Sequence, residues 1–197
     1  MLSKLQAAQA AAGLRSRGRG AIFVTALASA LAVAPALPAT AGDGKDTFEG
    51  SCEFPVRVTF DPPLTNSSRR THAEADGRGR CSGTWTTAAG RERTLDDARV
   101  VYHAESDGRQ SCAASEGPTG DGFLRYREHT IKFTFSESRA GTTARVELDG
   151  KRGGAFEGTA NASGDEDPVE IAEKCTSTGL RQAGATITGS TAPEISG

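Results

Sequence analysis

The chain has 197 residues, of which only 6% are aromatic, and it carries 23 basic and 25 acidic residues. Four of the basic residues lie before residue 42, so the rest of the chain keeps 19 basic residues against all 25 acidic ones, a net charge of −6. This balance excludes nucleic acids and anionic membranes as electrostatic partners, because both need a basic footprint.

Residues 1–41 are expected to form a secretion signal. A leader without acidic residues precedes an apolar run, Ala21 to Ala34, which is shorter than the roughly 20 residues that span a bilayer. Ala39-Thr40-Ala41 has the small-x-small pattern of a signal-peptidase site. We therefore expect cleavage near Ala41 and a secreted domain of residues 42–197. An uncleaved membrane anchor is the alternative.

All four cysteines, Cys52, Cys81, Cys112 and Cys175, follow the predicted signal. An even number of cysteines in an exported chain predicts two disulfides. A cysteine-ligated metal is disfavoured because the sequence contains no C-x-x-C motif.

The clearest element is a strand from Phe48 to Phe60, in which apolar side chains alternate with polar ones. It should end at Asp61-Pro62-Pro63, since proline donates no ladder hydrogen bond. The midpoint between Cys52 and Cys81 falls in the turn-like Asn66-Ser67. A hairpin here would place these two cysteines opposite each other. We therefore predict Cys52–Cys81 and, by elimination, Cys112–Cys175.

Further segments with alternating apolar and polar residues follow, and residues that favour turns separate them, so each is a predicted strand. They cover 81–87, 98–105, 110–115, 122–128, 130–136, 143–149, 155–160 and 181–188.

One helix interrupts the pattern. Asp167 is expected to cap it, with Pro168 at its first position, Ile171 and Cys175 on one face, and Gly179 at its end. The tail 189–197 is expected to be loose.

About nine short strands and one short helix predict a single all-β domain, either an antiparallel β-barrel or a β-sandwich. The hairpin-like order favours the barrel, which leaves no exposed edge.

Three short motifs, Gly50-Ser51-Cys52, Phe60 to Thr65 and Cys81 to Thr84, resemble uncharacterised small secreted all-β proteins of high-GC Gram-positive bacteria. This resemblance implies no particular activity. The glycine-interrupted strands are also similar to those of biotin-binding barrels, but that family lines its pocket with several tryptophans. This chain has one tryptophan, Trp85, so the resemblance does not imply that it binds biotin.

Motifs of catalysis are missing. The sequence has no G-x-S-x-G and no H-E-x-x-H, and its three histidines lie in separate segments. The closest acid–base pair is His103 with Glu105, on the face expected to be wet.

No catalytic residue, metal ligand or cofactor is predicted. An acidic cluster, Asp165, Glu166, Asp167 and Glu170, raises the possibility of calcium, but helix capping already accounts for the last two residues.

Trp85, Tyr102 and Tyr126 are the aromatic residues with a polar group, so they are candidates for ligand binding. The alternative is that they belong to the core.

The favoured function is a non-enzymatic binding module, expected to be monomeric, with an unidentified ligand or protein partner. The first alternative is a protease inhibitor that exposes Arg69-Arg70 or Arg109. The second is a hydrolase with scattered catalytic residues.

Overall fold

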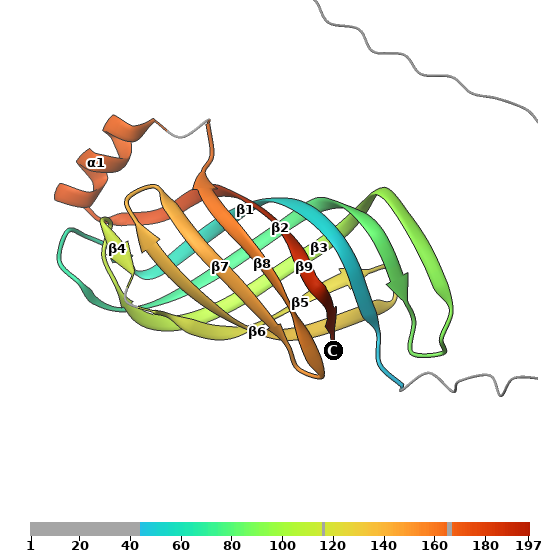
Figure 1. Cartoon of the computed structure of the whole chain (residues 1–197). Helices are drawn as coiled ribbons and strands as arrows, with labels where there is room; N and C mark the ends of the chain where they lie inside the picture. The colour runs from blue at the N-terminus through green and yellow to red at the C-terminus, as the bar shows by residue number, and fades with distance from the viewer. Residues whose placement is uncertain (1–43, 116, 165–166) are drawn as a thin grey trace, which may run out of the picture. The chain divides into compact units, whose positions relative to one another are not determined.

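The computed structural model describes residues 44–115, 117–164 and 167–197 (Figure 1). Within these ranges it contains nine antiparallel strands and one helix, which confirms the all-β class. The strands are β1 (Thr47–Leu64), β2 (Arg69–Thr86), β3 (Glu92–Gln110), β4 (Ala114–Ser115), β5 (Thr119–Tyr126), β6 (His129–Ala140), β7 (Thr143–Gly150), β8 (Gly153–Ala162) and β9 (Leu180–Ser196). The helix is α1 (Pro168–Thr176).

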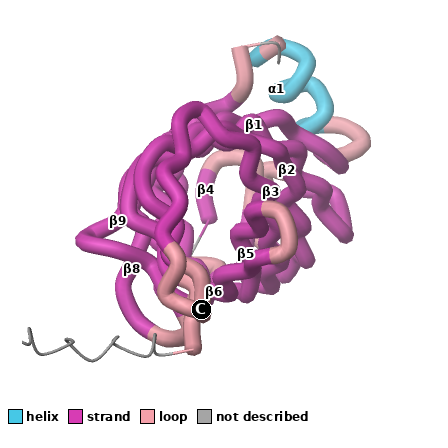
Figure 2. The backbone as a smooth tube through the Cα atoms, turned by 90° about the vertical axis from the view of Figure 1, so that its right-hand side faces the viewer, coloured by secondary structure: helices cyan, strands magenta, loops and turns pink. Residues whose placement is uncertain are grey.

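The strand pairings close the sheet into a barrel. Each of β1, β2, β3, β5, β6, β7, β8 and β9 pairs with the next, and β9 pairs back with β1. The two-residue β4 bridges β3 and β6 at one end. The ring of strands is seen end-on in Figure 2.

Both predicted disulfides form. Cys52 of β1 lies directly opposite Cys81 of β2, with their Cα atoms 4.1 Å apart. Cys112, just after β3, is bonded to Cys175 of α1. The first disulfide joins two paired strands of the barrel wall, and the second ties the helix to the barrel.

Strand boundaries are where the sequence analysis was wrong. β1 continues through Asp61, Pro62 and Pro63 to Leu64, because its pairing with β9 becomes irregular there and so does not need the missing proline donors. The predicted loose tail is also wrong. Residues up to Ser196 belong to β9 and pair with β1 and β8.

The barrel interior is unevenly filled. In the half that is remote from α1, large side chains pack tightly, among them Phe48, Phe54, Trp85, Phe133 and Phe156, each at most 1% exposed. In the half next to α1, alanine and valine occupy many inward positions. A second small cluster of buried residues, including Phe60, Leu64 and Leu180, packs around Cys175.

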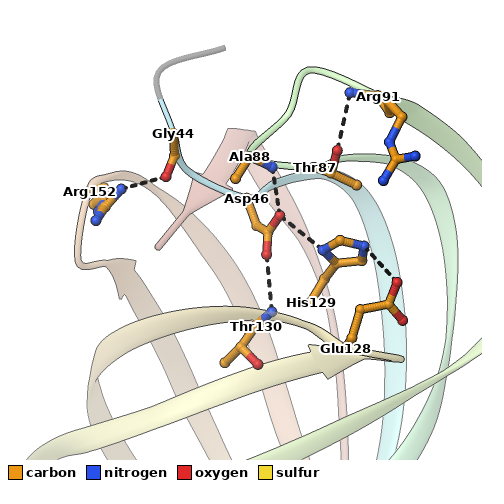
Figure 3. Close-up of polar contacts among 9 residues, drawn as sticks. All are labelled: Gly44, Asp46, Thr87, Ala88, Arg91, Glu128, His129, Thr130 and Arg152. Atoms are coloured by element: carbon orange, nitrogen blue, oxygen red, sulfur yellow. Dashed lines mark hydrogen bonds and ion pairs between the residues drawn. The ribbon is translucent and has the colours of Figure 1, made fainter.

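Asp46 lies at the packed end of the barrel (Figure 3). Its carboxylate accepts hydrogen bonds from the backbone N–H groups of Ala88 (2.9 Å) and Thr130 (3.1 Å) and lies 3.4 Å from His129 Nδ1. The Arg152 guanidinium donates to the Gly44 carbonyl. These contacts join the start of β1 to the β2–β3 loop and to β6, so this end is closed.

Among the described residues, no helix is long and apolar enough to cross a lipid bilayer.

Candidate functional site

The α1 end of the barrel contains a cavity of about 370 Å³. This volume is within the range of small-molecule sites, roughly 300–1,000 Å³. Much of its wall is alanine: Ala73, Ala75, Ala104, Ala160, Ala183 and Ala185. The cavity exists because many inward positions here carry only a methyl group, whereas large rings fill much of the other half of the barrel.

The strands place these small residues by simple alternation. On β2, Thr71, Ala73 and Ala75 point inward between exposed or half-buried neighbours. On β9, Ala183 and Ala185 do the same before the buried Ile187. Backbone pairing is therefore complete around the ring while the interior stays open.

Helix α1 contributes one side of the cavity mouth. Pro168, Ile171 and Ala172 line it, together with Cys175, whose disulfide anchors the helix. The Asp167 side chain accepts a hydrogen bond from Val169 N, which satisfies the helix start as the sequence predicted. The helix is thus held at one side of the opening by one covalent bond and a few apolar contacts.

Polar side chains gather on the β3 and β6 side of the cavity. We call Tyr102, Ser106, Gln110, Glu137 and Arg139 the polar wall; all five line the cavity. Glu137 Oε1 accepts from Ser115 Oγ (3.0 Å) and lies 3.5 Å from Arg139 Nε. Arg139 also donates to the Ser111 carbonyl at 2.7 Å. The two charges therefore balance each other at the site.

Burial shifts the pKa values of two residues of the polar wall, Tyr102 and Arg139. Burial, with a smaller effect from the negative charge of Glu137, raises the pKa of Tyr102 well above its usual value of 10.0. Its hydroxyl therefore remains a hydrogen-bond donor at any physiological pH. Burial lowers the pKa of Arg139, and Glu137 partly offsets the effect.

The three aromatic candidates do not share one site. Tyr102 lines the cavity, whereas Trp85 is fully buried in the packed half, between Phe48 and Tyr126. Sequence reasoning missed Gln110, Glu137 and Arg139. A signal for Glu137 and Arg139 existed: in β6 they continue the inward positions of Phe133 and Phe135, which is unusual for charged residues.

A second polar group lies on the outer face of β2 and β3. The Nδ1 atom of His103 is 2.8 Å from Asp76 Oδ1, and its Nε2 atom is 3.1 Å from Glu105 Oε1. Glu74, Asp76 and His103 place possible metal-ligand atoms within 4.8 Å of one another. Because both ring nitrogens of His103 already contact carboxylates, the arrangement is explained without a metal.

The remaining sequence candidates are dispersed. Asp165 and Glu166 lie outside the described residues, and Glu170 pairs with Lys174 within α1. Arg69 donates to the Pro63 carbonyl, and Arg70 pairs with Arg109 in the register of β2 and β3. The arginines therefore lie in strands rather than on a projecting loop.

No protein-family model, curated protein or solved structure matches this chain.

Proposed function

We propose that this protein is a non-enzymatic binding module that holds a small, largely apolar molecule in the cavity at the α1 end of the barrel. The observation that carries this proposal is the alanine-lined cavity of about 370 Å³, which a disulfide-anchored helix borders on one side. Filling a core with larger side chains would stabilise the fold, so an open interior in a closed sheet favours a bound molecule as its use.

The size of the cavity limits the ligand. A volume of about 370 Å³ lies near the lower end of the range of small-molecule sites, roughly 300–1,000 Å³, so the cavity suits a compact ligand such as a single alkyl chain or a few rings. The lining favours aliphatic or ring carbons over sugars, because Val56, Val58 and the alanines offer no hydrogen bonds.

We also propose that the protein acts outside the cell, after removal of residues 1–41. The leader sequence and the two disulfides support this location. Intact mass analysis of the protein from culture medium should give a chain beginning at Gly42 with no free thiol. A cell-associated protein that retains its leader would contradict it.

The binding proposal is tested with N-phenyl-1-naphthylamine, a neutral fluorophore that brightens in apolar surroundings. We expect saturable enhancement with the wild-type protein. Ala185→Phe should abolish it, because the ring would enter the cavity opposite Val56. Thr188→Phe, which adds the same ring to an exposed position of the same strand, is the matched control and should leave binding intact. Equal fluorescence with all three proteins would overturn the proposal.

A further inference from the structure

The cavity is chemically two-sided. Its β1, β8 and β9 side is apolar and includes Val56, Val58, Ala160, Ala185 and Ile187, whereas its β3 and β6 side is the polar wall. The other polar lining residues, Asn66, Thr142 and Asn161, are exposed. A purely hydrocarbon ligand would use only one of these two sides.

Gln110 shows most directly that the polar wall needs a partner. The residue is 3% exposed and lines the cavity, yet its Nε2 group has no hydrogen-bond partner within the described part of the chain. Buried polar groups are almost always hydrogen-bonded, since an unmade bond costs free energy. An acceptor on a bound molecule would satisfy this amide.

The charges of the wall indicate what kind of group this is. Glu137 and Arg139 neutralise each other, and the Arg139 guanidinium is further engaged by the Ser111 carbonyl. A ligand carboxylate would gain from Arg139 but would be repelled by Glu137. A ligand ammonium would gain from Glu137 but would be repelled by Arg139. Either ion would lose its hydration and would meet a pair of charges that already neutralise each other.

A hydroxyl group fits both kinds of site on this wall. It can accept from Gln110 Nε2 and donate to a lone pair of the Glu137 carboxylate, whose contacts with the described side chains are made through Oε1. The protonated Tyr102 hydroxyl adds a further donor beside the same cavity.

We propose that the ligand is a neutral amphipathic molecule, with an apolar body against β1, β8 and β9. Its polar end is either a hydroxyl group held by Gln110 and Glu137 or a carbonyl group held by Gln110. This inference rests on the proposed binding function and adds the class of ligand: alcohols and ketones, in preference to acids or amines with the same carbon skeleton.

The first test compares 1-decanol, decanoate and decylamine as competitors for bound N-phenyl-1-naphthylamine at pH 7. The alcohol should bind at least about tenfold more tightly than either ion, because only the ions lose uncompensated charge hydration. Decanoate or decylamine binding as tightly as 1-decanol would overturn this inference. Failure of the fluorophore itself to bind would instead overturn the binding function.

Two variants test the residues. Gln110→Leu should weaken 1-decanol binding about three- to tenfold relative to fluorophore binding, as expected for one lost hydrogen bond. Glu137→Gln leaves Arg139 without its counter-charge, so decanoate should gain relative to 1-decanol. Unchanged competition by 1-decanol in the first variant, or an unchanged preference in the second, would contradict the assigned roles.

Discussion

His103 shows how register brings distant residues together. The sequence placed it beside Glu105 on a wet face, and the structure confirms this placement. The β2–β3 pairing adds Asp76 directly opposite His103. That contact could not be foreseen, because it depends on the alignment of two strands and not on local spacing.

The first prediction concerns pH. Burial alone would lower the pKa of His103, but hydrogen bonds to Asp76 and Glu105 outweigh it, so the pKa is raised above the ordinary 6.5. A raised folded-state pKa gives stabilisation that is complete below pH 6.5 and disappears as the pH rises through the folded-state pKa. We expect about 1 kcal/mol or less, since the two carboxylates are 63% and 55% exposed.

Urea unfolding at pH 5.5 and pH 9 measures this effect. Wild-type protein should exceed His103→Gln in the free energy of unfolding by more at pH 5.5 than at pH 9. Asp76→Asn should reduce the difference between the two pH values. A wild-type advantage that grows with pH would contradict the assignment.

Gly79 illustrates a second effect that the sequence concealed. It lies in the middle of β2, and a Cβ there would be 2.1 Å from the Glu53 carbonyl oxygen and 2.4 Å from Phe54 Cδ1. The glycine therefore permits a close approach of β1 to β2.

The second prediction is that Gly79→Ala destabilises the protein by about 1–3 kcal/mol, because strand backbones must separate to admit the methyl group. Gly164→Ala is the control, since a Cβ at Gly164 meets no atom within 4 Å. Thermal unfolding of both variants provides the measurement. Equal melting temperatures would show that β1 and β2 have more room than the structure gives them.

At the scale of elements, the sequence predicted the features that have local causes. The cap, first residue and end of α1 follow from Asp167, Pro168 and Gly179, and the Gly179 N–H donates to the Lys174 carbonyl as a helix end requires. Symmetry of the chain about Asn66-Ser67 predicted the Cys52–Cys81 pairing. Neither feature depends on the rest of the barrel.

The first half of β2 was missed for the same reason that the cavity was missed. Its inward residues are Thr71, Ala73 and Ala75, which do not stand out as a hydrophobic alternation. Small inward side chains make a strand hard to recognise and leave space inside the barrel. Whether facing side chains fill that space depends on their arrangement around the ring, which one sequence does not reveal.

The third prediction separates the two disulfides. Replacing Cys112 and Cys175 by serine should expose the amides of α1 to hydrogen exchange while the barrel stays folded, because the helix has few other anchors. Chain entropy sets the loss of stability at no more than about 4 kcal/mol. Replacing Cys52 and Cys81 should instead raise exchange in β1 and β2. Exchange mass spectrometry distinguishes these patterns, and barrel-wide exchange in the first variant would contradict them.

The fourth prediction concerns the cap of α1. Asp167→Ala should destabilise the helix by about 1 kcal/mol, since the Val169 N–H loses its acceptor. Hydrogen exchange in α1 should accelerate while exchange in β1 to β9 stays unchanged. Asp167→Asn retains an acceptor oxygen and should behave like the wild type. Similar exchange in the alanine and asparagine variants would argue against capping.

At the scale of the whole molecule, the two ends of the barrel differ in how tightly their interior is packed. The aromatic half and the Asp46 contacts close one end, and the alanine half leaves the other end open next to α1. Stability and the proposed binding therefore depend on different residues of the same strands.

The fifth prediction follows from this difference and compares one valine-to-alanine substitution in each half of the barrel. Both valines belong to the main buried cluster, but Val146, 4% exposed, also lines the cavity, whereas Val100, 1% exposed, does not. Val100→Ala should cost about 2 kcal/mol, because it adds a new void to the lost burial. Val146→Ala should cost about 1 kcal/mol, since its methyl groups already border open space. Denaturant unfolding compares the two, and a saturating neutral ligand should raise the cost of Val146→Ala alone. A larger cost for Val146→Ala without ligand would mean that the alanine half is as tightly packed as the aromatic half.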